Sequence, residues 1–212
     1  MSVFVSLLQH YQVLVLLQLC DLTMFRLVFL ISLSISSMIS ISAQKVVVDN
    51  GHFYSVYDVQ MNVPSQVEWI IKSTDLGPIK REPSWKFRND PKHPEVLATH
   101  SDYTRSGYDR GHMCAAADRS KSKELMRSTF VMSNVAPQTP WVNRGYWKAT
   151  ENFCRQAVER YDSVHVLAMP IFLHRDTTYI GAHRVAVPHA YFKCAWLPSN
   201  DSIIGVWFVF NQ

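Results

Sequence analysis

The stretch YDRGHMCAAADRS, from Tyr108 to Ser120, sets an arginine and a histidine two residues apart, after an acid and before a run of small residues. A neutral histidine can accept a proton from water near pH 7, and an arginine presents a fixed fork of donors to phosphate oxygens. The same pattern also fits a turn histidine beside the start of a helix. Which interpretation holds depends on the residues that share a site with His112.

The length and composition of the chain predict one globular domain. The 212 residues are 48% hydrophobic and 18% charged, which excludes a disordered or fibrous protein. The basic excess behind the net charge of +4 lies between Lys80 and Arg127, the third of the chain that contains His112. A concentrated excess of this kind is typical of a polyanion-binding face.

The N-terminus has the pattern of a secretory signal. Asp21 and Arg26 are its only charged side chains up to Ala43, and LVFLISLSISSMISI follows the short basic start. We expect residues 1–43 to be a signal peptide or N-terminal hydrophobic segment, cleaved near Ala43, and residues 44–212 to form the functional domain in a secreted or periplasmic location. The alternatives are a membrane-anchored chain with an uncleaved segment, and a true start at Met24.

The cysteine content bears on the redox state. Cys114, Cys154 and Cys194 follow the expected signal, so an oxidising compartment allows one disulfide and one free thiol, and the sequence does not choose the pair. No two cysteines have the CxxC spacing, which argues against a structural zinc site.

The pattern of apolar residues predicts an α+β domain in which strands dominate. Trp147, Cys154 and Val158 recur at helical spacing and predict a helix across 139–161. Residues 77–107 are expected to form a long irregular connection, and Ser120 or Ser122 to cap a short helix. Runs of β-branched and aromatic residues predict strands within 45–73, at 130–132, within 163–172 as a buried strand, within 177–196 and within 202–210.

The long helix carries a pattern of possible metal ligands. Asn143, Trp147 and Glu151 are four residues apart, so α-helical geometry would place them on nearly one face, with Asn143 and Glu151 roughly 12 Å apart along the axis. An amide oxygen and a carboxylate that holds a coordinated water would suit Mg²⁺, which keeps several waters. From the helix alone the simpler interpretation is favoured, in which Asn143 caps the helix and Glu151 is solvated.

The neighbouring loop and strand add supporting groups. The amides of Asn134 and Gln138 are expected to bond backbone groups of the loop that leads into Asn143. Asp109 is expected to orient the turn or a neighbouring side chain, and Arg88 offers a second fork for phosphate beside Arg110. Hydrolysis of a phosphodiester needs a base, a charge-stabilising group and a phosphate clamp, and these residues supply all three.

Three segments together resemble one family. DRGHMCAAAD (109–118), FVMSNVAPQTPWVNRGYWKATE (130–151) and VAVPHAYFK (185–193) are similar to the DNA/RNA non-specific endonucleases, the endonuclease G-like ββα-metal nucleases. The resemblance covers about residues 67–196. It implies the ββα-metal, or His-Me finger, fold, with a central mostly antiparallel sheet flanked by helices.

The resemblance implies a role for each matched residue. His112 would be the general base, Asn143 the sole direct protein ligand of Mg²⁺, and Glu151 the group that holds one of its waters. Asn134 would support the site. Mn²⁺ or another divalent ion is an alternative cofactor. Two arginines would bind the substrate at the phosphate and the leaving group, namely Arg110 and Arg88.

The implied activity is hydrolysis of phosphodiester bonds in DNA and RNA without sequence specificity, because contacts to phosphates carry no base information. A homodimer and an inhibitor protein are further partner hypotheses. Met169 stands where the family usually has glycine, which predicts an altered local turn, whereas Ala115 in place of proline is an accepted variation. Relatives commonly continue beyond the strand that ends near Gln212, so the alternative function is a truncated, catalytically inactive nucleic-acid binder.

Overall fold

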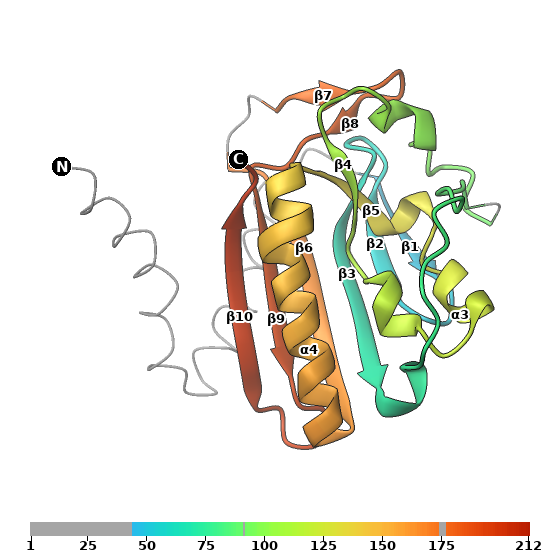
Figure 1. Ribbon diagram of the computed structural model, residues 1–212. Helices are drawn as coiled ribbons and strands as arrows, with labels where there is room; N and C mark the ends of the chain where they lie inside the picture. Colours follow the sequence, from blue (N-terminus) through green and yellow to red (C-terminus); the bar gives the residue numbers. More distant parts are fainter. Residues whose placement is uncertain (1–43, 91, 174–176) are drawn as a thin grey trace. The chain divides into compact units, whose positions relative to one another are not determined.

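Six antiparallel strands form the main sheet of the protein (Figure 1). The computed structural model describes residues 44–90, 92–173 and 177–212, so the predicted signal, its cleavage site and Cys20 lie outside the described residues. The strand order is β1-β2-β3-β6-β9-β10. Their bounds are β1 (Lys45–Asp49), β2 (Tyr54–Asp58), β3 (Val63–Lys72), β6 (Ser163–Ile171), β9 (Ala190–Trp196) and β10 (Ile203–Phe210).

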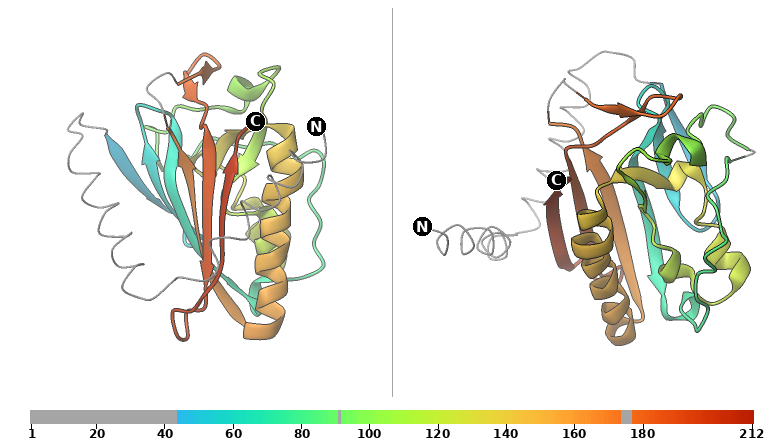
Figure 2. Two further views of the ribbon diagram at one scale, coloured as in Figure 1. Left: turned by 90° about the vertical axis from the view of Figure 1, so that its left-hand side faces the viewer. Right: turned by 45° about the horizontal axis from the view of Figure 1, so that its top comes forward.

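The sheet is covered on one face by the long helix α4 (Lys148–Tyr161), which runs beside the strands in both views of Figure 2. Strand β6 was expected to be buried, but its residues alternate between buried and half-exposed. Val164, Val166 and Ala168 point into the core, and the intervening side chains lie on the opposite face. Strand β6 therefore has only one fully covered face among the described residues.

Met169 does not alter a turn, contrary to the sequence-based expectation. It lies within β6 and pairs with Phe192 of β9, and the strand continues through Pro170 to Ile171. The pairing with β9 is regular over this segment, so methionine in place of the family's glycine is accommodated without a shift in strand register.

A second, smaller unit carries the motif. Strand β4 (Asp109–His112) pairs antiparallel with β5 (Val135–Gln138), and His112 lies opposite Val135. The chain then enters the predicted helix, whose first part is a π-helix, η5 (Val142–Trp147), that leads directly into α4. The helix prediction is confirmed, but uniform α-helical geometry was wrong for the segment that carries Asn143.

The remaining elements connect these two units. Helix α3 (Lys123–Arg127) begins at Ser122, whose hydroxyl accepts a hydrogen bond from the Leu125 amide, as one of the two predicted caps. The strand predicted at 130–132 is wrong, because Val131 makes only an isolated bridge with Arg88. The short elements are η1 (Ser73–Asp75), η2 (His100–Tyr103), η3 (Ala116–Arg119), η4 (Met132–Asn134), β7 (Tyr179–Ile180) and β8 (Val185–Ala186).

The described cysteines form no disulfide. Cys114, Cys154 and Cys194 are all buried and none is disulfide-bonded, so the single disulfide that the sequence allowed is absent from this part of the chain. Burial raises the pKa of the Cys154 thiol to about 12, which keeps it protonated and apolar. Within the described ranges, no helix is both long and apolar enough to cross a membrane.

Candidate active site

Strand β4 is fastened to the helix at both of its ends. The Asp109 carboxylate accepts a hydrogen bond from Asn143 Nδ2 at 2.9 Å, and the His112 carbonyl accepts one from Trp147 Nε1 at 3.0 Å. The structure thus brings two of the predicted site residues, His112 and Asn143, into one rigid β4-β5-helix unit.

The His112 imidazole packs against two phenylalanine rings that also contact each other. The ring centroids of Phe87 and Phe130 are 4.6 and 4.7 Å from that of His112, and Nε2 is buried without a hydrogen-bond partner among the described residues. Burial, and secondly the charge of Arg81, lower the pKa of His112 to about 3. His112 is therefore neutral near pH 7, and the same burial makes it a weaker proton acceptor than an exposed histidine.

Asn143 is held by a charged partner. Arg144 donates to both oxygens of Asp109 at 2.8 Å. Although partial burial raises the pKa of Asp109, the hydrogen bonds from Arg144 and Asn143 lower it below the usual value. An ionised carboxylate only accepts hydrogen bonds, so Asn143 turns its Nδ2 toward Asp109 and its Oδ1 away. The side chain caps no helix, and the capping interpretation of Asn143 is wrong.

The free amide oxygen of Asn143 fits a hard cation, since Mg²⁺ binds oxygen ligands and keeps most of its waters. No group of three or more His, Cys, Asp or Glu side chains in the described ranges could hold a metal. A metal at this site would therefore be held by few protein oxygens together with water.

Glu151 is half-buried in α4 rather than freely solvated, so the second simple interpretation is also wrong. Burial raises the pKa of Glu151 to about 7, while the charge of Lys193 lowers it and that of Asp118 raises it. A carboxylate with this pKa can change protonation state near neutral pH. Trp147, between Asn143 and Glu151 in the sequence, is fully buried.

Asn134 is a structural clamp behind His112. It is fully buried, its Nδ2 donates to the carbonyls of Cys114 and Thr129 at 2.9 and 3.0 Å, and its Oδ1 accepts from the Cys114 amide at 2.8 Å. The predicted target was wrong, because these bonds fix the segment after His112 and not the loop before Asn143. Gln138 is also buried, but its amide has no hydrogen-bond partner among the described residues.

Gly111 lies against the Gln138 side chain, where a Cβ would come within 2.3 Å of Gln138 Cδ. We expect Gly111→Ala to destabilise the domain by about 1–3 kcal/mol, because the buried Gln138 side chain must shift in a packed core. Urea unfolding monitored by tryptophan fluorescence measures this change. Gly145→Ala is the matched control, since its Cβ meets nothing within 4 Å. Equal stability of the two variants would contradict the steric argument.

The two predicted phosphate-binding arginines have different surroundings. Arg110 donates through Nε and Nη2 to the His100 carbonyl and through Nη2 to Thr104 Oγ1 at 2.9 Å, so much of its fork holds the η2 segment. Arg88 is exposed, and its backbone bonds to Phe130 and Met132 place it beside the segment that contacts His112. Their roles at the substrate stay predictions.

Exposed cations surround this region. The charges of Arg110, Lys86 and Arg81, after burial, lower the pKa of His100, and Arg81 also acts on His112. Arg81, Lys86 and Arg88 are all exposed. This part of the predicted basic excess therefore lies near His112, as a polyanion-binding surface requires.

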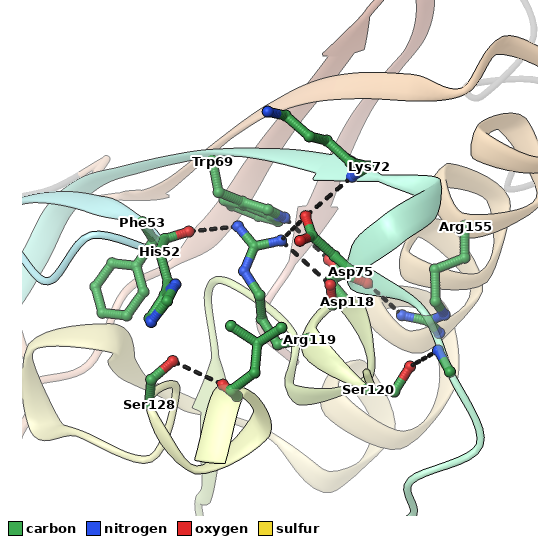
Figure 3. A network of polar contacts seen from close by, with 12 residues as sticks. His52, Phe53, Trp69, Lys72, Asp75, Asp118, Arg119, Ser120, Ser128 and Arg155 are labelled. Carbon is green, nitrogen blue, oxygen red and sulfur yellow. Dashed lines mark hydrogen bonds and ion pairs between the residues drawn. The ribbon is translucent and has the colours of Figure 1, made fainter. Parts of the chain in front are cut away.

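A buried ionic network that the sequence did not predict fixes α4 to the sheet (Figure 3). Asp118 accepts from Trp69 Nε1 at 2.9 Å and from Arg155 Nη1 at 2.6 Å, and Arg119 donates to Asp75 at 3.1 Å. Arg155 lies one helical turn beyond Glu151. The sequence places Asp118 and Arg119 side by side at the end of the motif, but it does not indicate that both are buried.

The comparison with known families agrees with this geometry. The sequence model of the DNA/RNA non-specific endonucleases matches residues 34–210. The chain belongs to this family. Its α+β fold, with the β4-β5-helix unit beside an antiparallel sheet, is that of a ββα-metal nuclease, as predicted.

Individual relatives are similar over part of their length. Nuclease EXOG, mitochondrial, of Danio rerio is 34% identical over 169 residues, 73% of this chain and 49% of that protein. Nuclease EXOG, mitochondrial, of Xenopus laevis is 38% identical over 74% of this chain and 48% of its own. Human Endonuclease G, mitochondrial, is 40% identical over 50% of this chain and 39% of its own. The chain thus spans about half the length of the first two relatives.

A solved structure extends the similarity to three dimensions. The crystal structure of the EndoG/EndoGI complex, which concerns the mechanism of EndoG inhibition, superposes with a TM-score of 0.70 at 30% sequence identity. The match covers 78% of this chain and 74% of that one. This structural similarity supports the assignment of the ββα-metal nuclease fold to most of the described domain.

Proposed function

We propose that this chain is a metal-dependent endonuclease that hydrolyses phosphodiester bonds of DNA and RNA without sequence specificity. The observation that carries the proposal is the geometry of the β4-β5-helix unit, in which His112 Nε2 has no hydrogen-bond partner among the described residues and Asn143 is oriented by Asp109. A protein that only bound nucleic acid would have no use for a neutral base beside an oriented amide oxygen.

The residues of this chain divide the work of hydrolysis. His112 would take a proton from water, whose oxygen attacks phosphorus as the bond to the 3′ oxygen breaks, leaving a 5′ phosphate. Asn143 Oδ1 would hold the metal, and the Glu151 carboxylate would accept a hydrogen bond from one of its waters. When bound, Mg²⁺ or another divalent ion would supply charge stabilisation at the phosphate and the departing oxygen.

The exposed cations near His112 support a substrate defined by its phosphates. Arg81, Lys86 and Arg88 can approach backbone oxygens in either nucleic acid, and such contacts carry no sequence information. Phe87 and Phe130 pack against the base and limit access of bulk water to it from that side.

The test is a cleavage assay with the purified chain. We expect plasmid DNA and RNA both to be degraded with Mg²⁺ or Mn²⁺, and excess chelator to stop the reaction. Products should carry 5′ phosphates. Salt-dependent retention of nucleic acid without cleavage at any divalent ion would refute the proposal and favour the inactive binder instead.

Three sequence-based predictions stay proposals: that the protein is secreted, that it forms a homodimer and that an inhibitor protein binds it. The expectation of export rests on residues 1–43, whereas the similar EXOG and Endonuclease G proteins are named mitochondrial. Comparing nuclease activity in the medium and in the cells of an expressing culture tests export. The inhibitor in the similar crystal structure belongs to that EndoG complex.

A further inference from the structure

Lys193 is a buried lysine that the proposed chemistry leaves without a role. It lies on β9 with no exposed surface, and its Nζ is 3.7 Å from the centroid of the Trp147 ring. Among the described residues Nζ has no hydrogen-bond partner. The residue belongs to the VAVPHAYFK segment, in which no sequence pattern indicated that the lysine would be buried.

An ammonium group in this position is costly. Lysine is almost never fully buried without a partner, because removing its charge from water carries a large desolvation penalty. Burial accordingly lowers the pKa of Lys193, and the strongest opposing influence is the charge of Glu151. The contact with the Trp147 face offsets part of the cost. A group maintained at this cost is expected to serve more than packing.

The surroundings of Lys193 lead to the candidate active site by two routes. Trp147, which receives the ammonium on its ring face, donates through Nε1 to the carbonyl of His112. Glu151, one turn further along the helix, experiences Lys193 as the largest charge that lowers its pKa. One buried cation therefore acts on the anchor of the base and on the carboxylate.

The other charges around Glu151 do not replace Lys193. Asp118 and Arg155 form an ion pair with an Nη1 to Oδ1 distance of 2.6 Å, so their effects on Glu151 largely oppose each other. Lys148 is exposed on α4, where water screens its charge. Lys193, on strand β9, is the fully buried cation among the charges that act on Glu151.

We propose that Lys193 is a positioning residue for the nuclease reaction, whose buried ammonium packs on the face of Trp147 and fixes that ring against the strand that carries His112. The proposal rests on the proposed nuclease function. Lys193 has no exposed surface, so it acts through Trp147 and not by contact with the substrate.

The charge and the packing of Lys193 can be separated by substitution. Methionine has a similar unbranched stem, so Lys193→Met keeps contact with Trp147 and removes only the ammonium. Replacing a buried unpaired charge by an apolar group of similar shape is often neutral or stabilising. If Lys193 serves folding alone, activity and melting temperature should fall in parallel when it is replaced, whereas a positioning lysine should lose activity alone.

The first experiment measures steady-state cleavage and thermal unfolding of the full chain. We expect Lys193→Met to lower kcat by about 10- to 100-fold, as loss of a supporting group typically does, with the melting temperature unchanged or raised. KM should stay within about threefold, because no substrate contact is lost. Lys193→Arg should retain more activity than Lys193→Met. Lys45→Met is the control and should behave as wild type, because Lys45 is an exposed lysine on the edge strand β1, away from β9.

A double-mutant cycle with Trp147→Phe tests the route of action. In that background we expect Lys193→Met to lower kcat by a clearly smaller factor, because the hydrogen bond from Trp147 Nε1 to the His112 carbonyl, through which Lys193 acts, is already absent. Equal factors in both backgrounds would overturn the proposal. So would an active wild type in which Lys193→Met stays within about twofold, or activity lost in parallel with folding.

The outcomes distinguish a failure of the positioning role of Lys193 from a failure of the proposed nuclease function. If Lys193→Met does not fold, Lys193→Gln is judged by the same criteria, and a matching loss of structure assigns Lys193 to folding alone. An active wild type with insensitive Lys193 variants would refute the positioning role and leave the nuclease function standing. An inactive wild type would refute both.

Discussion

Cleavage of both DNA and RNA is expected to fall by about two to four orders of magnitude when His112 is replaced by alanine, the usual contribution of a positioned general base. The substitution removes the buried, neutral imidazole and its unpartnered Nε2, and water has no comparable acceptor in its place. The measurement is the initial rate of plasmid and RNA degradation with Mg²⁺, from which kcat and KM are obtained.

Two controls distinguish lost chemistry from lost structure. His52→Ala removes an exposed histidine and should leave the rate unchanged. His112→Ala leaves a space beside the rings of Phe87 and Phe130, so added imidazole should restore part of the activity of the variant. Full activity of His112→Ala would show that the base has been assigned to the wrong residue.

Much of the fold follows from short-range patterns. Strands β3 and β10, the Ser122 cap and the long helix were all predictable, because alternation, turn residues and helical spacing are local properties of the chain. The π-helix was not predictable. It is anchored by contacts of Asn143 and Trp147 with β4, more than 30 residues away in the sequence.

Contacts with residues distant in the sequence also explain the wrong predictions at the site. His112, Asn143 and Glu151 were identified as candidates from the sequence, but capping and solvation could be rejected only once Asp109 and the burial of Glu151 were known. Asn134 bonds Cys114 because η4 lies beside the residues after His112. The Phe87 and Phe130 rings that contact His112 come from segments in which no sequence motif indicates a function.

Asn143→Ala is expected to abolish most metal-dependent cleavage, with a loss of about two to three orders of magnitude, because a bound cation supplies several kcal/mol of charge stabilisation. The variant loses Oδ1, the oxygen that Asp109 turns away from itself by accepting Nδ2. Folding should be largely retained, since Asp109 keeps both hydrogen bonds from Arg144.

The sharper measurement is the dependence of rate on metal concentration. If Asn143 holds the ion, the Mg²⁺ concentration for half-maximal activity should rise in Asn143→Ala, and saturating metal should recover part of the rate. Gln156→Ala, an exposed amide on α4, should titrate as wild type. Unchanged metal dependence in Asn143→Ala, with the rate reduced, would assign the residue to substrate placement instead.

Asp109→Asn separates orientation from ligation. The substitution keeps the shape of Asp109 but makes it a donor as well as an acceptor, so Asn143 is no longer compelled to point Nδ2 at it. We expect a smaller loss than for Asn143→Ala, again with weaker metal dependence, because the ligand is present but populates the productive orientation for only part of the time. A larger loss would mean that the charge of Asp109 acts on the reaction directly.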